Sequence, residues 1–239
     1  MAYQATFKRY EIKYILTQAQ KQRLLEYMAS RMALDQYGRT TIRNLYYDTD
    51  TYRLIRHSME KPVYKEKLRL RSYTCVSQDT PIFVELKKKY KGVVYKRRLS
   101  MPEQQAIDWI GGSCPMPADN QISREIDYFI RYYRTLKPVV FLSYEREAYY
   151  CRCGSDLRIT FDDRILCRQT SLSLESQPDG IPLLEDGKVL MEIKTAGAIP
   201  LWLTEFLSRE GIFKTSFSKY GTAYAKIIYP NRKGDHLYA

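Results

Sequence analysis

The sequence predicts an α+β protein in which an antiparallel β-sheet closes into a barrel and helices pack on the outside. Three observations lead to this prediction. The chain has 239 residues, of which 44% are hydrophobic and 28% charged, and this composition is typical of a globular protein with a sizeable core. Long stretches alternate between polar and apolar residues with period two, as strands do. Only a few segments show the 3.6-residue period of an amphipathic helix.

The strand prediction rests on six segments that share one pattern. Their bounds are 7–16, 64–73, 82–89, 93–100, 157–163 and 189–195. Each puts charged side chains on one face and apolar side chains on the other, because successive residues of a strand point to opposite faces. The second segment is the clearest case, with four basic residues at alternate positions: Lys65, Lys67, Arg69 and Arg71. One face of that strand is therefore predicted to be entirely cationic.

Helices are predicted where apolar residues recur every three or four positions. Thr17 can cap a helix over 18–32, and Pro102 opens a turn that leads into a short helix. Further helices are predicted at about 123–136, 201–208 and 218–227. Loop-forming segments cover 111–117 and 176–182. Neither loop has the character of a domain linker, so residues 1–230 are predicted to form one domain, followed by a polar tail at 231–239.

The net charge and the cysteines narrow the function classes. The formal net charge of +12 predicts an anionic partner: a nucleotide, a polyphosphate, a nucleic acid or an acidic membrane surface. No segment has the roughly 18 consecutive apolar residues of a membrane span, and the amino terminus carries no signal-like stretch, so a cytoplasmic location is predicted. The five cysteines are unevenly spaced and accompanied by only two histidines, which predicts reduced thiols and no zinc site.

The repeated cationic face has two interpretations. It can be the solvated face of an ordinary antiparallel sheet, with no role beyond solubility. Alternatively, the charged faces point into the barrel, where an anion lies between like charges that would otherwise repel. The second interpretation is favoured because Lys and Arg dominate these faces and the acids are too few to neutralise them. It predicts a cationic tunnel that holds a polyanion.

Eight motifs occur in order along the chain. They are RYEIKY at 9–14, YYDT at 46–49, KLRLR at 67–71, FVELK at 83–87, SYER at 143–146, LRITFD at 157–162, MEIK at 191–194 and FSKY at 217–220. Through them, about residues 3–228 resemble the VTC-type polyphosphate polymerase domain of the CYTH, or triphosphate tunnel metalloenzyme, superfamily. The resemblance implies a barrel of about eight antiparallel strands around a tunnel. It also implies transfer of the terminal phosphoryl group of ATP onto a growing inorganic polyphosphate chain.

The resemblance implies the site residues as well. The catalytic positions that contact phosphate are matched by Lys13, Arg69, Arg71, Lys87, Lys96, Arg146, Arg158 and Lys219. Substrate binding extends this set with Lys67, Arg98 and Lys194. Glu192 matches the acid that holds a divalent metal, Mn²⁺ or Mg²⁺. These residue types suit the reaction, because Arg and Lys neutralise phosphate oxygens and a hard cation prefers carboxylate oxygen. The alternative for Glu192 is a salt bridge to Lys194 or a neighbouring arginine.

Three positions depart from a simple pattern. Arg146 shares its predicted face with apolar residues, which indicates either a bulge in that strand or an apolar end of the tunnel. Superfamily hydrolases generally carry Glu-x-Glu-x-Lys on the first strand, where this chain has Arg9, Glu11 and Lys13. The missing acid favours the polymerase over a two-metal hydrolase. Ser216 stands where some polymerases have a lysine, for which Lys214 can compensate.

Two other functions remain open, and RNA binding is a weaker third. One is a tripolyphosphatase or nucleoside triphosphatase of the same superfamily, and the other is a non-catalytic module that binds polyphosphate or nucleotide. ATP and inorganic polyphosphate are the expected partners, whereas nucleic acid is not. The sequence does not identify a membrane-protein partner.

Overall fold

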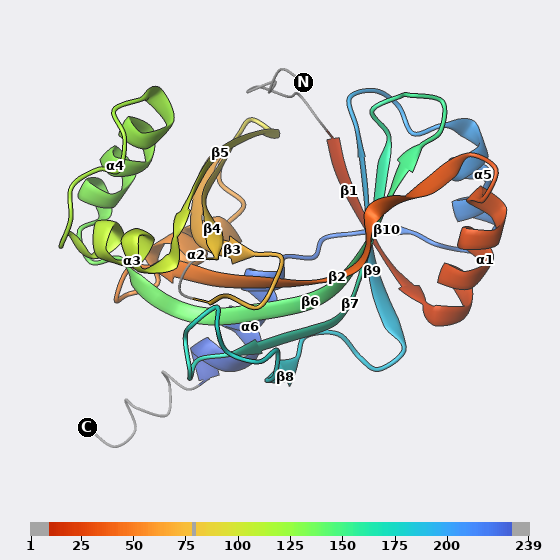
Figure 1. The fold of residues 1–239 in the computed structure, drawn as a ribbon. Helices are drawn as coiled ribbons and strands as arrows, with labels where there is room; N and C mark the ends of the chain where they lie inside the picture. Colours follow the sequence, from red (N-terminus) through yellow and green to blue (C-terminus); the bar gives the residue numbers. More distant parts are fainter. Residues whose placement is uncertain (1–9, 78–79, 231–239) are drawn as a thin grey trace.

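A computed structural model of the chain describes residues 10–77 and 80–230 (Figure 1). In chain order the elements are β1 (Tyr10–Thr17), α1 (Gln18–Met28), β2 (Met32–Asp48), α2 (Arg53–Met59), β3 (Tyr64–Ser72), β4 (Pro81–Tyr90), β5 (Val93–Pro102), α3 (Glu103–Gly111), α4 (Gln121–Tyr133), β6 (Lys137–Cys151), β7 (Arg158–Arg168), β8 (Ile181–Pro182), β9 (Lys188–Thr195), α5 (Leu201–Arg209), β10 (Lys214–Thr215), α6 (Lys219–Ala223) and the π-helix η1 (Tyr224–Ile228). The predicted α+β class is confirmed.

The strands form one antiparallel sheet. Its order is β10-β1-β9-β7-β6-β2-β3-β4-β5, and β8 pairs with β7 outside this path. All six predicted strand segments are found among the described residues, and the strand predicted around Arg146 is part of β6; the other long central strand, β2, was not predicted. Among the described residues no backbone ladder joins β5 to β10, so the hydrogen-bonded sheet stops short of the fully closed barrel predicted from the sequence.

The sheet nevertheless curls strongly. In Figure 1, β2 and β6 run across the middle of the molecule, β3 to β5 rise on one side of them, and β1 and β9 stand on the other. Side chains from the two halves meet: Nζ of Lys87 on β4 lies 3.3 Å from Oε2 of Glu11 on β1, although these strands are far apart in the sheet order. The charged face is therefore the inner face of a curled sheet.

Helices cover the outer face at both ends of the sheet (Figure 1). A buried cluster that includes Leu68, Leu70 and Trp109 joins β3 and β4 to α3 and α4. A second cluster, which includes Leu24, Met191 and Phe206, joins β1, β7 and β9 to α1 and α5. This arrangement confirms that the apolar faces of the strands lie under the helices, as the alternation predicted.

A third buried cluster lies on the inner face. It places Tyr220 and other residues of α6 and η1 against Val140, Leu142 and Tyr144, which share their face of β6 with Arg146. The strand keeps its alternation there; the bulge between the β6 and β7 registers lies in β7, where Arg164 has a φ of 46°. Of the two explanations for Arg146, the apolar tunnel end is correct: the carboxyl-terminal helices cover it.

Most element boundaries follow from local chemistry. Thr17 caps α1 as predicted, in a capping box where its hydroxyl accepts from the Gln20 amide and the Gln20 side chain accepts from the Thr17 amide. The helix ends at Met28 and not at residue 32, because the chain turns into β2 at Met32. The predicted helix over 218–227 is split between α6 and η1.

Three smaller predictions can also be compared with the structure. Cys151 and Cys153 form a disulfide, so the prediction of reduced thiols was wrong for them, whereas Cys75, Cys114 and Cys167 are free. Within residues 10–77 and 80–230, no helix has the length and apolarity to cross a membrane. Arg9 and the predicted tail at 231–239 lie outside the described residues.

Asp48 joins α2 and α6 to the end of β2. It is fully buried, and its carboxylate accepts hydrogen bonds from the amides of Thr49, Leu54 and Ile55 and from the Tyr220 hydroxyl at 2.8 Å. We expect Asp48→Ala to lower the free energy of unfolding by about 2–3 kcal/mol, because it leaves several buried donors without acceptors. Urea denaturation measures this loss. Asp50→Ala, in the exposed turn beside it, is the control and should change stability by less than about 0.5 kcal/mol.

Candidate phosphate-binding site

Two clusters of cations occupy the inner face of the sheet, each built around a buried acid. The Glu85 cluster lies on β3, β4 and β5 and consists of Arg69, Arg71, Glu85, Lys96 and Arg98. The Glu192 cluster lies on β1, β6, β7, β9 and α6 and consists of Lys13, Arg146, Asp162, Glu192, Lys194 and Lys219. Between them they contain eight of the eleven cations predicted to bind substrate.

Glu85 is the acid at the centre of the first cluster. Its side chain is 1% exposed, and its two oxygens lie 2.8 Å from Arg69 Nη2 and 2.8 Å from Lys96 Nζ. Arg98 Nη2 approaches at 2.5 Å and Arg71 Nε at 3.8 Å. Burial by itself would raise the pKa of Glu85, but the four cations outweigh it and hold this pKa well below the usual range. Glu85 is thus a fixed negative charge.

Neutral side chains orient the two arginines of β3. Arg69 Nη1 donates to the Tyr46 hydroxyl at 2.8 Å, and Arg71 donates to Asn44 Oδ1 at 2.9 Å and to the Tyr144 hydroxyl at 3.0 Å. Asn44 is fully buried and Arg71 is 6% exposed. These contacts hold the planar guanidinium groups in defined orientations, which bidentate recognition of phosphate requires.

The Glu192 cluster contains two neighbouring acids. Asp162 is fully buried. Its carboxylate accepts hydrogen bonds from Arg146 Nε at 2.6 Å and Nη2 at 2.7 Å, and it pairs with Lys219 Nζ at 2.5 Å. Glu192 has looser contacts, with Lys194 Nζ at 3.1 Å, Lys13 Nζ at 3.5 Å, Lys219 Nζ at 3.5 Å and Arg146 Nη2 at 3.7 Å. The sequence-based alternative for Glu192, a salt bridge to Lys194 or an arginine, is thus present.

The remaining predicted residues differ in their surroundings. Lys87 connects the halves of the sheet through Glu11, which also contacts Lys13 at 3.2 Å. Arg158 stands opposite Lys194 in the β7–β9 register, but its guanidinium pairs with Asp35 at 3.0 Å and is 49% exposed. The structure therefore brings ten of the eleven cations toward one another and directs Arg158 elsewhere. Lys214, which was expected to compensate for Ser216, lies opposite Tyr14 in the β1–β10 register. It therefore shares the outer face with Tyr14 and does not lie beside Lys13 on the inner face.

Except for Glu192, the acids of this face, and the neutral side chains that orient its arginines, were not predicted as site residues. Glu85 and Asp162 are absent from the predicted site residues. Both nevertheless lie an even number of residues from a predicted cation of the same strand, and therefore on the same face. With Glu11 and Glu192 they neutralise more of the charge than was expected. Four acids face the ten predicted cations that remain after Arg158 is set aside, so the inner face keeps a net positive charge.

Lys67 lies among other cations. Within the described part of the chain no carboxylate pairs with it, and Nζ donates to Ser218 Oγ at 3.1 Å. Burial, reinforced by Lys87, Lys65, Lys13 and Arg69, lowers the pKa of Lys67 to about 7. Its ammonium is therefore partly deprotonated near neutral pH until an anion arrives.

This lowered pKa predicts a pH dependence. An anion bound beside Lys67 favours the charged form, so binding of tripolyphosphate should take up a proton near pH 7 to 8 and should weaken as the pH rises to about 9. The stability of the unliganded protein depends on pH in the opposite direction. Between pH 7 and 10.5 the unfolded chain binds more protons at Lys67 than the folded chain does, so the contribution of Lys67 to the free energy of unfolding rises with pH.

Isothermal titration calorimetry in buffers of different ionisation enthalpy measures the proton uptake. Lys67→Met should remove part of it while leaving a folded protein, because Lys96, whose pKa is also lowered to about 7 by burial, takes up a proton as well. Equal proton uptake by Lys67→Met and the unchanged protein would assign the titration to another group. Lys91→Met, an exposed lysine in the β4–β5 turn, is the control.

Glu192 has the donor chemistry that a divalent metal needs. A carboxylate oxygen suits Mg²⁺ or Mn²⁺, and phosphate oxygens and water can complete the coordination. The part of the chain that the structure describes holds no group of three or more His, Cys, Asp or Glu side chains placed to bind a metal together. The residues present therefore fit an ion that is held jointly by Glu192 and a bound phosphate chain.

Comparisons with known proteins identify the family and the fold. The family model for the VTC domain matches residues 8–228. No curated protein matches the chain by sequence. A putative adenylate cyclase from Bacillus halodurans has a similar structure, with a TM-score of 0.56 at 16% identity, covering 90% of this chain and 96% of that one. A putative adenylyl cyclase from Hippeastrum, described as having a dominant triphosphatase activity, gives a TM-score of 0.54 at 16% identity, covering 90% and 94%.

At 16% identity these two likenesses concern the fold alone. The family match is of another kind, because it spans nearly the whole described chain and includes both cation clusters. It confirms the resemblance seen in the sequence motifs, and the chain belongs to the VTC domain family.

Proposed function

We propose that this protein transfers the terminal phosphoryl group of ATP onto an inorganic polyphosphate chain. The observation that carries the proposal is the pair of cation clusters on the inner face, one on each half of the curled sheet, linked by the ion pair between Lys87 and Glu11. Two anionic chains, the triphosphate of ATP and the acceptor polyphosphate, can each occupy one cluster and meet between them. A cytoplasmic location, where ATP is available, is part of the same proposal.

The proposed roles follow from the chemistry of phosphoryl transfer. The reaction needs positioning and neutralisation of charge on the nonbridging oxygens, and it requires no nucleophilic side chain. Arg69 and Arg71 offer bidentate donors in fixed orientations, whereas the lysines act as mobile point charges. When a phosphate chain binds, Lys13 and Lys219 can leave Glu192 for phosphate oxygens. Glu192 then becomes available to a metal.

The metal would have one task. When bound by Glu192 and phosphate oxygens, Mn²⁺ or Mg²⁺ supplies a further positive charge against the transferring phosphoryl group. Arg146 remains anchored by Asp162, which keeps its charge in place through the reaction.

An activity assay tests the proposal. Purified protein with ATP, Mn²⁺ and a short polyphosphate primer should produce longer phosphate chains and ADP, visible on a polyacrylamide gel. Release of orthophosphate without chain growth would instead support the second candidate, a tripolyphosphatase or nucleoside triphosphatase. The triphosphatase activity of the similar Hippeastrum protein favours that candidate, whereas the single acid among Arg9, Glu11 and Lys13 speaks against a two-metal hydrolase.

The third candidate, a non-catalytic module, predicts a different outcome. Such a protein would bind tripolyphosphate tightly on the same cations but would turn over neither ATP nor polyphosphate under any metal condition. Binding with no phosphate transfer or release would therefore replace an enzymatic function by a binding function.

A further inference from the structure

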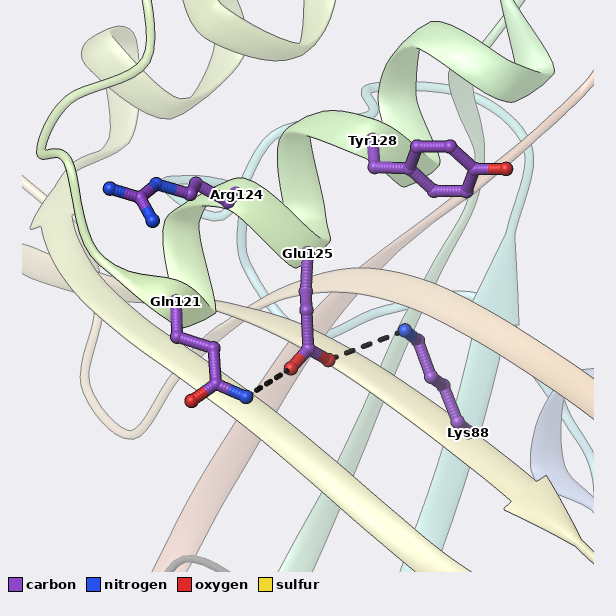
Figure 2. A pocket seen from close by; sticks show the side chains of 5 residues that line it. All are labelled: Lys88, Gln121, Arg124, Glu125 and Tyr128. Carbon is purple, nitrogen blue, oxygen red and sulfur yellow. Dashed lines mark hydrogen bonds and ion pairs between the residues drawn. The ribbon is translucent and has the colours of Figure 1, made fainter.

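A pocket lies outside the cationic inner face. It has a volume of about 580 Å³ and lies between α2, the start of β3 and α4. Its strand residues Glu66 and Lys88 alternate with Lys65, Lys67 and Lys87, so they point to the outer face of the sheet. A smaller recess of about 300 Å³ shares Lys88 and Tyr128 with it (Figure 2). Neither hollow takes part in the proposed reaction.

Tyrosines of α4 provide flat surfaces in this pocket. Tyr128 is 70% exposed and Tyr132 is 53% exposed, so both rings present accessible faces. Their ring planes differ by only 22°, with centroids 6.2 Å apart, one turn of helix from each other. In Figure 2, the Tyr128 ring extends from the helix above the Lys88 side chain. Exposed, nearly parallel rings of this kind are suited to stacking with a planar ligand.

Two arginines in the same pocket have unused donors. The guanidinium carbon of Arg53 lies 5.7 Å from the centre of the Tyr132 ring and 5.6 Å from that of Tyr133. Arg56 has one long hydrogen bond, at 3.5 Å, to the carbonyl of Thr51. Within residues 10–77 and 80–230, neither guanidinium forms a salt bridge, so most of their N–H groups are available to an anion.

The acids of the pocket do not neutralise these arginines. Glu66 accepts hydrogen bonds from the Tyr64 hydroxyl at 2.5 Å and from the Tyr133 hydroxyl at 3.0 Å. Glu60 lies 3.6 Å from His57 Nδ1. On the same outer face, the Lys88 ammonium forms an ion pair with Glu125 at 3.4 Å, and Figure 2 shows this pair. The net result is a pocket with free guanidinium groups beside exposed aromatic rings.

We propose that this pocket binds a nucleotide, with its base stacked on Tyr128 or Tyr132 and its phosphate held by Arg53 and Arg56. A nucleotide combines a planar ring and an anion at the spacing of one small pocket, and the volume is in the range of known ligand sites. A peptide offers no obligatory anion, and a nucleic acid strand needs a longer groove. The site lies on the opposite face of the sheet from the cation clusters, so it would be independent of the phosphate chains bound there.

Calorimetry with the full chain tests the site. AMP is the probe, and saturating tripolyphosphate is present to occupy the inner face. AMP should bind under these conditions, whereas adenosine, which lacks the phosphate, and inorganic phosphate, which lacks the base, should each bind at least about tenfold more weakly.

Two variants locate the binding. Arg56→Ala and Tyr132→Ala should each weaken AMP binding at least about tenfold and leave the affinity for tripolyphosphate unchanged, which also shows that the variants are folded. Tyr37→Ala removes a tyrosine elsewhere that is 71% exposed, more than Tyr132, and should have no effect. The proposal is overturned if AMP does not bind, if tripolyphosphate displaces it, if both variants bind it normally, or if a short oligonucleotide binds at this pocket in its place. None of these outcomes depends on polymerase activity.

Discussion

Glu85→Gln should destabilise the unliganded protein by about 3–5 kcal/mol, and saturating tripolyphosphate should restore most of that loss. The substitution keeps the shape of the side chain and removes its charge. Arg69, Arg71, Lys96 and Arg98 then repel one another around a position that is 1% exposed. A bound polyanion supplies the missing negative charge, so the stabilisation by ligand should be larger in the variant than in the unchanged protein.

Urea denaturation with and without tripolyphosphate measures both effects. Glu125→Gln is the matched control, because Glu125 also contacts two cations, Lys88 at 3.4 Å and Arg97 at 3.0 Å, but lies on the outer face with 24% exposure. Its loss should cost less than about 1 kcal/mol, and tripolyphosphate should not compensate for it. If Glu85→Gln were as stable as the unchanged protein, the inner cations would not depend on this acid for charge balance.

Glu192→Gln should reduce phosphoryl transfer by about 10²–10³-fold while leaving tripolyphosphate binding intact or tighter. Glu192 is surrounded by four cations and has a strongly lowered pKa; burial would raise this pKa, but Lys194, Lys219, Lys13 and Arg146 outweigh burial. Replacing it removes a negative charge that repels phosphate, and it also removes the proposed metal ligand. Affinity and activity should therefore change in opposite directions.

Steady-state rates over a range of Mn²⁺ concentrations, together with calorimetric binding of tripolyphosphate, separate the two effects. The variant should need more Mn²⁺ for its residual activity. Glu185→Gln, an exposed acid before β9, should behave like the unchanged protein. Full activity in Glu192→Gln would exclude the metal role, and loss of tripolyphosphate binding would assign Glu192 to the structure of the site.

How much of the fold could be predicted depended on the polarity of the two faces of each strand. Strands with one polar face, such as β3 and β9, alternate clearly and were found from the sequence. The central strands β2 and β6 are flanked on both faces, by α3 and α4 outside and by α6 and η1 inside, so much of their length is buried on both sides. Apolar side chains on both faces weaken the alternation that signals a strand.

The same distinction applies to the site. The identity of the cations was evident from the sequence, because basic residues at alternate positions of one strand must share a face. The partners of these cations were not evident from the sequence. Asp162 contacts Arg146 on the neighbouring strand and Lys219 on a helix 57 residues away, and the contact with Lys219 is decided only by the tertiary fold.

The sequence by itself determined the residue types of the inner face, the family and the antiparallel sheet, because these depend on local periodicity and on motif order. Only the tertiary structure decided that Glu85 and Glu192 each collect four cations, that Arg158 turns toward Asp35, and that α6 and η1 cover one end of the inner face. Each of these depends on strand register, on the curl of the sheet or on helix packing, which bring residues distant in the chain within the few ångströms over which charges pair.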